Sequence, residues 1–258
     1  MEKPVRLDKF LADAGAGTRS EVKKYIQKGQ VQVNGKTVKK PELKVTEEDQ
    51  VVMNGQEIHA APEYVYYLFN KPAGCVSATE DSRDKTVLDY IEEKDRRKGL
   101  FPVGRLDKDT EGFLLITDDG IFNQKLTHPS YHKEKTYEFT LLGDLTPELV
   151  HKLETGVILK GADTLTAPAK ITVTGHAVMS DILSTLPEEI QKDIHKNRPE
   201  HPVTYGIITI SEGKKRQIRR MMKSVHCCVI ELKRISIGDI VLDKALCPGE
   251  WKEIFPHT

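Results

Sequence analysis

Apolar residues at the start of the chain repeat first with the period of a helix and then with that of a strand. The stripe that predicts the first helix is formed by Leu7, Phe10, Leu11 and Ala14. A second helix is predicted from Thr18, because Glu21 stands three residues later as in a capping box, and Gly29 ends it. Alternation then predicts strands on both sides of Asn34-Gly35, a strong hairpin signal.

From residue 64 onward the pattern mixes strands with helices. Strands are predicted at 64–69, 113–117, 135–142, 169–175, 205–210 and 227–232. A helix is predicted after Thr146, with Pro147 at its first position, and two more are predicted at 187–197 and 212–223. These elements predict an α+β fold with a mixed or antiparallel sheet.

The same pattern divides the chain into two domains. A second Asn-Gly hairpin is predicted at 51–58, and the stretch 59–63 has the composition of a linker. We therefore expect a small domain of two helices plus hairpin over residues 1–60, and a larger domain over 61–258. A chain of 258 residues is long enough for both.

Composition excludes several classes of protein. Hydrophobic residues make up 38% and charged residues 30%, which is typical of soluble globular proteins. The longest apolar stretch, 64–69, is far below the roughly 20 residues that cross a bilayer, and the first residues lack the apolar core of a signal peptide. The four cysteines form no C-x-x-C motif. We expect a cytoplasmic protein with reduced thiols and no membrane contact.

Charge is distributed unevenly along a chain whose formal net charge is +0. Residues 1–44 contain eleven basic and five acidic residues, so this segment carries +6 and the remainder −6. A solvated helix face is the ordinary interpretation of such residues, but the shortage of acids here favours a nucleic-acid surface. The candidate RNA-binding side chains in this segment are Arg6, Lys9, Arg19, Lys23 and Lys24.

Four stretches of the second domain could carry chemistry. The loop Gly-Arg-Leu-Asp-Lys-Asp-Thr-Glu-Gly at 104–112 contains two carboxylates, Asp107 and Asp109, before a buried strand. The stretch 212–223 has six cations and no acid after Glu212, which favours an anionic partner. The weaker signals are Tyr137 in 132–139 and the Asn-Lys-Pro-Ala-Gly turn at 70–74. From pattern alone, the first loop could equally be a polar turn.

Other kinds of site have little support. The chain has no glycine-rich nucleotide-binding motif. His128 and His132 are four residues apart, but Pro129 argues against one helix face for both, so we predict no metal site. Nothing in the sequence fixes the geometry of a catalytic triad.

Two segments resemble known families. The stretch 6–36 is similar to the αL RNA-binding domain found in ribosomal small-subunit protein four. The order of the stretches 70–74, 104–112, 134–137 and 213–221 resembles that of the bacterial ribosomal RNA pseudouridine synthases with an N-terminal αL domain. Residues 101–120 and 234–251 look most similar to the RsuA-type branch, which acts on uridine 516 of 16S ribosomal RNA.

The resemblance implies a catalytic domain that isomerises uridine to pseudouridine without a cofactor. It implies that Asp107 is the essential carboxylate, that Tyr137 stacks on the uracil or helps the C5 proton leave, and that Arg219 pairs with Asp107. Whether Asp107 attacks C1′, adds to the base or removes a ribose proton stays open. The expected substrate contacts of this domain are Lys71, Arg105, Lys135, Arg216 and Arg220.

Three alternatives concern the target and the class of function. The first alternative is a pseudouridine synthase that acts on 23S ribosomal RNA, because the Lys-Lys-Arg at 214–216 is nearer the large-subunit branches. A non-catalytic RNA-binding ribosome-assembly factor is the second, although it has no need for the 104–112 motif. An RNA methyltransferase is the third, and it lacks a glycine-rich cofactor loop. In the preferred interpretation the protein is a monomer whose partner is small-subunit ribosomal RNA or an assembly intermediate.

Overall fold

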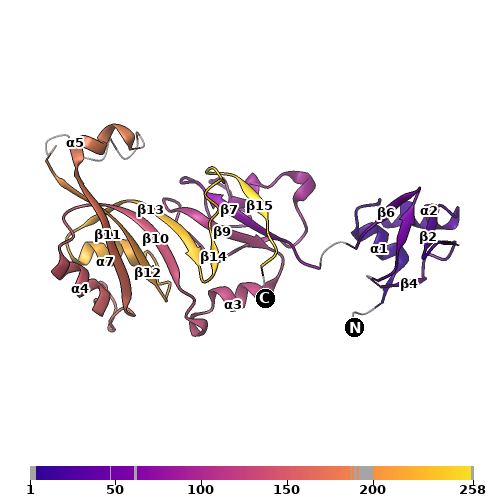
Figure 1. The fold of residues 1–258 in the computed structure, drawn as a ribbon, viewed down its shortest axis with the longest axis horizontal. Coiled ribbons are helices and arrows are strands. Elements are labelled where there is room, and N and C mark those ends of the chain that lie inside the picture. Colours follow the sequence, from indigo (N-terminus) through magenta and orange to yellow (C-terminus); the bar gives the residue numbers. More distant parts are fainter. Residues whose placement is uncertain are drawn as a thin grey trace. The chain divides into compact units, whose positions relative to one another are not determined.

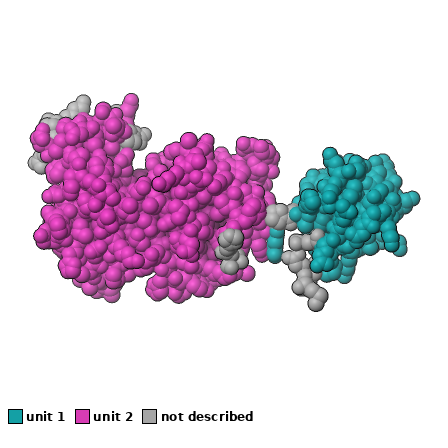
Figure 2. Space-filling view, in the orientation of Figure 1, with its two compact units in different colours: residues 1–63 teal, residues 64–258 magenta. Residues whose placement is uncertain are grey.

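The computed structural model describes residues 4–46, 48–60, 63–186, 188, 191 and 200–256. The chain folds into two compact units, Met1–Glu63 and Tyr64–Thr258, which Figure 2 shows in different colours. The boundary falls at the end of the linker-like stretch 59–63. The charged helix expected at 187–197 lies outside the described residues, apart from 188 and 191.

The first unit consists of two short helices and two small sheets. Its elements are β1 (Val5–Arg6), α1 (Leu7–Asp13), α2 (Arg19–Gln27), β2 (Val31–Val33), β3 (Lys36–Val38), β4 (Lys44–Val45), β5 (Val51–Met53) and β6 (Gln56–Ile58). Strands β1 and β4 pair with each other, and the other four form a sheet in the order β3-β2-β5-β6. The helices pack through Leu7, Leu11, Val22 and Ile26, all fully buried.

Local sequence signals set the boundaries of these elements. The capping box at the start of α2 is confirmed, because the Thr18 hydroxyl accepts from the Glu21 amide and the Glu21 carboxylate accepts from the Thr18 amide. Both predicted hairpins are also confirmed. Asn34 and Gly35 have φ of 50° and 75°, and Asn54 and Gly55 have 53° and 81°, the left-handed values that a tight two-residue turn requires.

The second unit is built on a nine-stranded sheet in the order β11-β12-β10-β13-β9-β7-β15, with β8 paired to β9 and β14 paired to β13 (Figure 1). The strands are β7 (Tyr66–Lys71), β8 (Phe101–Val103), β9 (Glu111–Thr117), β10 (Lys135–Leu142), β11 (Ala169–Val178), β12 (Pro202–Ile210), β13 (Cys228–Ile237), β14 (Ile240–Val241) and β15 (Trp251–Glu253). All pairs are antiparallel except β13 with β9, so the sheet is mixed.

Helices and short 3-10 turns connect these strands. They are η1 (Val87–Tyr90), η2 (Glu93–Asp95), α3 (Gly120–Thr127), η3 (Pro129–Tyr131), α4 (Pro147–Thr155), α5 (Met179–Ile182), η4 (Leu183–Thr185) and α7 (Gln217–Ser224). The basic helix expected over 212–223 therefore begins later than predicted. Arg216 adopts a left-handed conformation with φ of 50°, and the Gln217 side chain accepts from the Lys214 amide, so 212–216 forms a loop.

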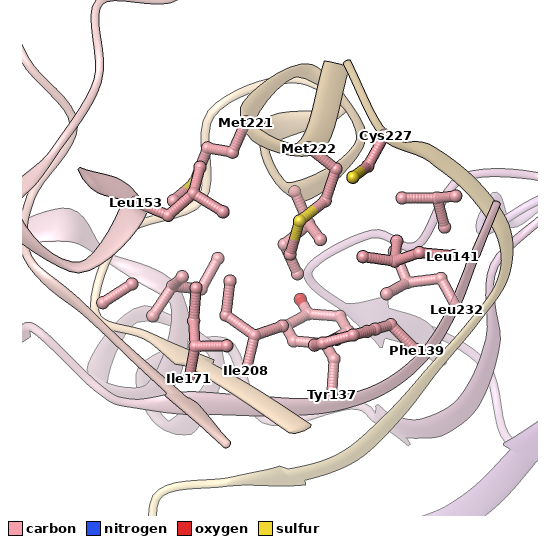
Figure 3. Packing of buried hydrophobic residues seen from close by; sticks show 14 of the residues in the cluster. Tyr137, Phe139, Leu141, Leu153, Ile171, Ile208, Met221, Met222, Cys227 and Leu232 are labelled. Carbon is pink, nitrogen blue, oxygen red and sulfur yellow. The ribbon is translucent and has the colours of Figure 1, made fainter. Parts of the chain in front are cut away.

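The largest hydrophobic core lies between the sheet and helices α4 and α7. Figure 3 shows Met221 and Met222 of α7 lying over Tyr137 and Ile208 of the sheet. The apolar face of α7 thus fixes the helix on β10 and β12, which sets where its basic face is presented.

Two expectations from composition concern the whole chain. Among the described residues, no helix has both the length and the apolar character needed to cross a membrane. The four cysteines are free thiols, with Cys75 and Cys227 buried and Cys228 and Cys247 exposed.

Candidate active site

A cleft of about 580 Å³ opens in the second unit, where the loop 104–110 faces the middle of the sheet. Strands β10 and β13 contribute Lys135, Tyr137, Leu232 and Arg234, and the segment 210–219 closes the opposite side. Three of the four stretches singled out in the sequence therefore contribute side chains to one cavity, although together they span residues 104–223 of the chain.

The fourth stretch, the turn at 70–74, supports this cleft from behind. Lys71 is fully buried, and its ammonium donates to the carbonyl oxygens of Pro72, Lys108 and Thr110 at 3.1, 3.4 and 2.9 Å. Burial lowers the pKa of Lys71. The expectation that Lys71 contacts substrate is therefore wrong: no surface of this side chain is open, and its role is to hold the loop 104–110 in place.

Two further contacts fix the same loop. The Ser77 hydroxyl accepts from the Leu106 amide and donates to the Leu106 carbonyl, both at 3.1 Å, directly before Asp107. The Gly74 amide donates to the Lys108 carbonyl at 2.8 Å. Ser77 carried no recognisable sequence signal, because a serine in a loop is common and its partner is a backbone segment 29 residues away.

The last glycine of the 104–112 motif has a steric reason. Gly112 has φ of +96°, and a Cβ built there would collide with the carbonyl oxygen of Arg234 in the paired strand β13. Only glycine accepts this close approach. The motif thus fixes the loop and also the backbone position of Arg234.

The two carboxylates of the loop have different environments. Asp107 lines the cleft, is partly exposed, and its side chain has no hydrogen bond or ion pair with any described residue. Asp109 is exposed, and its carboxylate accepts a hydrogen bond from Arg216 at 3.1 Å and forms an ion pair with Arg219 at 3.2 Å. The ion pair expected between Arg219 and Asp107 is therefore wrong, since the guanidinium reaches the second carboxylate of the motif.

Arg219 acts as a brace between three elements. In addition to its ion pair with the Asp109 carboxylate, Arg219 donates to the backbone carbonyl oxygen of Asp109 at 2.9 Å and to that of Val229 at 3.1 Å. Burial lowers the pKa of Arg219. The negative charge of Asp109 opposes this shift, and the charge of Asp107 opposes it less strongly. An arginine stays protonated in this range, so Arg219 also supplies positive potential to the cleft that it lines.

The sheet side of the cleft contains Tyr137 and two cations. Tyr137 lies opposite Arg234 in the β10–β13 pairing and is 8% exposed, and its hydroxyl has no hydrogen bond to a described residue. Lys135 lies two residues earlier on β10, and burial lowers its pKa, as does the charge of Arg234. Sequence reasoning missed Arg234. The available signal was a charged residue in phase with the buried Leu232 of the same strand.

The remaining expected contacts of this unit separate into two groups. Arg105 and Arg216 are exposed and line the cleft, as a phosphate contact would require. Arg220 is not among the residues that line it: its guanidinium donates to the carbonyl oxygens of Lys160 at 2.6 Å and Lys215 at 3.4 Å. Arg220 therefore stabilises the loops beside α7, and its expected part in substrate binding has no support in this arrangement.

In the first unit, three of the expected RNA-binding cations surround one carboxylate. Asp8 is fully buried and lies 3.0 Å from Arg6, 3.5 Å from Arg19 and 3.8 Å from Lys23. Hydrogen bonding from Arg6 lowers the pKa of Asp8. The three cations keep about half of their side-chain surface exposed, and Lys9 and Lys24 are exposed on the same helices. The result is a basic surface organised by a buried acid.

Comparisons with known proteins agree with the division of the chain into two units. An RNA pseudouridylate synthase family model matches residues 65–224, and an S4 domain model matches residues 5–51. In the described part of the chain, no group of three His, Cys, Asp or Glu side chains is placed to hold a metal ion.

Several full-length relatives match over nearly the whole chain. An uncharacterised RNA pseudouridine synthase of Bacillus subtilis, YtzG, is 40% identical over 97% of this chain and 95% of its own. Ribosomal large subunit pseudouridine synthase B of the same organism is 37% identical, covering 98% and 93%. Ribosomal small subunit pseudouridine synthase A of Haemophilus influenzae is 33% identical, covering 97% and 96%. A crystal structure of a pseudouridylate synthase aligns with TM-score 0.60 and 30% identity over 97% of this chain and 96% of that one.

Proposed function

The chain belongs to the RNA pseudouridylate synthase family, and we propose that it isomerises a uridine of ribosomal RNA, with uridine 516 of 16S ribosomal RNA as its target. The observation that carries the proposal is the position of Asp107. Its carboxylate lies in the cleft with no partner in the described protein, on a loop that Lys71, Ser77 and Gly74 hold rigidly. A carboxylate kept free of protein partners is available to a substrate.

The reaction breaks the N1–C1′ bond, turns the uracil and joins C5 to C1′. N1 gains one proton and C5 loses one, so uridine and pseudouridine are isomers and no oxidant or reductant is consumed. We assign the carboxylate step to Asp107, either as nucleophile at C1′ or at the base, or as the base that removes a ribose proton. Tyr137 supplies a ring beside the place where the base must lie, together with a hydroxyl that is free to assist the loss of the C5 proton.

The substrate nucleotide has to leave its stack to reach a side chain in a cleft, which costs a few kcal/mol. We assign Arg105 and Arg216 at the rim to holding the flanking RNA, and Lys135, deeper in the cleft, to contacting the substrate nucleotide itself. In the first unit, Arg6, Lys9, Arg19, Lys23 and Lys24 add sequence-independent attraction to phosphates. Arg219 then contributes as a positioning residue, because it ties Asp109 to α7 and β13.

The choice of target rests on relatives. The proteins from Haemophilus influenzae and Yersinia pestis named ribosomal small subunit pseudouridine synthase A are 33% and 35% identical over 97% of this chain, which supports 16S ribosomal RNA. A second candidate is 23S ribosomal RNA, because the large-subunit synthase of Bacillus subtilis is 37% identical and because Lys-Lys-Arg occupies 214–216. In either case we expect a cytoplasmic monomer, since the substrate is ribosomal RNA.

The deciding experiment maps pseudouridines in both ribosomal RNAs from cells with and without this gene. Loss of pseudouridine at 516 of 16S ribosomal RNA, restored by the wild-type gene and not by Asp107→Asn, supports the proposal. Loss at a 23S position instead establishes the second candidate. Unchanged maps together with defective subunit assembly would indicate a non-catalytic assembly factor.

A further inference from the structure

Arg234 has an environment that its structural contacts do not explain. It is 3% exposed and lines the cleft, and its Nε donates to the Phe113 carbonyl at 2.9 Å. Its Nη2 is buried and has no hydrogen-bond partner among the described residues. An unsatisfied donor on a buried charged group is costly, and a ligand that accepts from it in the cleft would remove that cost.

A second cation on the same side of the cleft makes the arrangement more unusual. Lys135 on β10 is also partly buried, and the charge of Arg234 lowers the pKa of Lys135, which shows that the two cations repel each other. Neither side chain forms an ion pair with a described carboxylate, although Asp81, Asp107 and Glu212 line the same cleft. The sheet side of the cleft therefore holds two positive charges that no described carboxylate pairs with directly.

The chemistry of the reaction offers an anion for this place. When N1–C1′ breaks, the electron pair stays on N1 and the detached uracil carries a negative charge shared with its carbonyl oxygens. This holds if Asp107 attacks C1′ and equally if it removes a ribose proton. If Asp107 instead adds to the ring, electrons move onto a carbonyl oxygen of the base. The charge is neutralised when C5 bonds to C1′, and the base then loses the C5 proton and gains one at N1.

Burial distinguishes this anion from a phosphate of the RNA strand. Phosphodiesters flank the flipped nucleotide and remain near the rim, where Arg105 and Arg216 are exposed. Arg234 instead pairs across the sheet with Tyr137, deep in the cleft, and Gly112 fixes its backbone beside the catalytic loop. A cation in such a water-poor position stabilises developing charge more strongly than an exposed one.

From these contacts, we propose that Arg234, assisted by Lys135, stabilises the negative charge of the detached uracil by donating from Nη2 to a carbonyl oxygen of the base. The proposal rests on the pseudouridine synthase function and does not depend on which ribosomal RNA is the target. It makes Arg234 a catalytic residue that acts during the chemical step, in contrast to the bracing role of Arg219.

Matched variants separate charge from structure. Arg234→Met and Arg234→Lys both remove the guanidinium fork, but only the second keeps a cation. Lys233→Met, the neighbouring residue on the opposite face of β13, is the control. The substrate is [5-³H]uridine-labelled ribosomal RNA from a strain lacking the gene, prepared from small and large subunits separately, both deproteinised and as particles. Tritium release is measured under single turnover at saturating RNA, beside RNA affinity and melting temperature.

We expect Arg234→Met to lower the saturating rate by about 10² or more, with RNA affinity within about threefold, and Arg234→Lys to recover at least about tenfold of the loss. Lys233→Met should leave the rate nearly unchanged. A normal saturating rate with weakened RNA affinity would make Arg234 a phosphate contact and overturn the proposal. Equal losses in both Arg234 variants with a matching fall in melting temperature would make its role structural and also overturn it.

The same assay keeps the two proposals distinct. Wild-type release from large-subunit RNA alone removes the 16S assignment, while the comparison of Arg234 variants proceeds on that RNA. Wild-type release from neither RNA removes the proposed function and the Arg234 proposal together.

Discussion

Charged side chains are arranged in opposite ways in the two units. In the first, the buried Asp8 is surrounded by Arg6, Arg19 and Lys23, so the acid is compensated within the protein. In the second, Asp107 has no partner among the described residues, and Arg234 lacks an ion pair. Both arrangements include a strongly buried charge, yet only the second leaves its charges available at the bottom of a cleft.

The difference follows from what each surface has to bind. Phosphates of a folded RNA are fixed charges at the surface, and a rigid group of exposed cations attracts them without any further rearrangement. A reacting nucleotide changes its charge during catalysis, so the groups that respond to it must not already be neutralised by a neighbour. Charges that are paired within the protein therefore indicate a binding surface in the first unit, and unpaired charges in the cleft of the second unit indicate a site of chemistry.

The largest expected effect tests the uncompensated carboxylate. Asp107→Asn preserves size and removes the charge, so the rate of isomerisation should fall by more than about 10²-fold, as is usual when a nucleophile or proton-transfer group is lost. Stability and RNA affinity should change little, because Asp107 forms no ion pair with a described residue that the substitution would break. Tritium release from C5-labelled RNA measures the rate, and filter binding measures the affinity.

Asp109→Asn is the control for this variant, since it removes the neighbouring carboxylate and keeps Asp107. Residual activity of Asp107→Asn above about a hundredth of wild type, or an equal loss in both variants, would take Asp107 out of the central role.

The second effect concerns the buried cation behind the loop. Lys71→Met leaves the Thr110 carbonyl oxygen without its donor and the Lys108 carbonyl oxygen with only the Gly74 amide. This should lower the free energy of unfolding by about 1–3 kcal/mol and reduce activity by displacing Asp107. Urea denaturation of the full chain measures the first quantity. Lys170→Met removes an exposed ion pair with Glu134 and should cost far less. Equal stability in the two variants would show that Lys71 does not hold the loop.

The behaviour of Lys71 illustrates what sequence could and could not predict. Helix periodicity, the Thr18 capping box and the two Asn-Gly hairpins are local signals, and the structure confirms each of them. The order of motifs was sufficient to predict the fold of the second unit and its membership of the synthase family. Whether a lysine beside a turn faces solvent or a neighbouring loop depends on contacts 37 and 39 residues away, and no local pattern contains that information.

Three other differences also depend on the folded structure. The Arg219 partner was predicted as the first aspartate of the motif and is the second, because the guanidinium position is set by α7 packing on the sheet. The basic run 214–216 was predicted as helix and is loop, because Arg216 is left-handed. Arg234 was missed because its burial becomes visible only once β13 is paired with β10 and β9.

A third, smaller effect measures how Arg219 is coupled to the loop. The pair Asp109 and Arg219 is part-exposed, so Asp109→Asn and Arg219→Gln in a double-mutant cycle should give a coupling free energy of about 0.2–1 kcal/mol in stability. The single-turnover rate should fall severalfold in each variant, because the loop that carries Asp107 loses a brace. Coupling with Asp107→Asn in place of Asp109→Asn should be weaker. Stronger coupling of Arg219 with Asp107 than with Asp109 would restore the pairing with Asp107 that the family resemblance implied.

The smallest effect tests compensation in the first unit through its pH dependence. Hydrogen bonding from Arg6 holds the pKa of Asp8 below its ordinary value, so the ionised carboxylate stabilises the folded unit at every pH above about 4, the unfolded value. That contribution disappears as the pH falls through the lower pKa of the folded state. In Asp8→Asn this contribution is absent at all pH values.

We therefore expect amides of α1 and α2 to exchange about two- to fivefold faster in the variant at neutral pH. The change is modest because Arg6, Arg19 and Lys23 are about half exposed. The ratio of exchange rates, variant over wild type in the full chain at the same pH, should stay constant down to about pH 5 and approach one below pH 4. Comparing the two proteins at each pH cancels the intrinsic pH dependence of exchange. A ratio that persists undiminished into acid would mean that Asp8 stabilises this unit by packing alone, and the contrast with Asp107 would then concern burial and not charge.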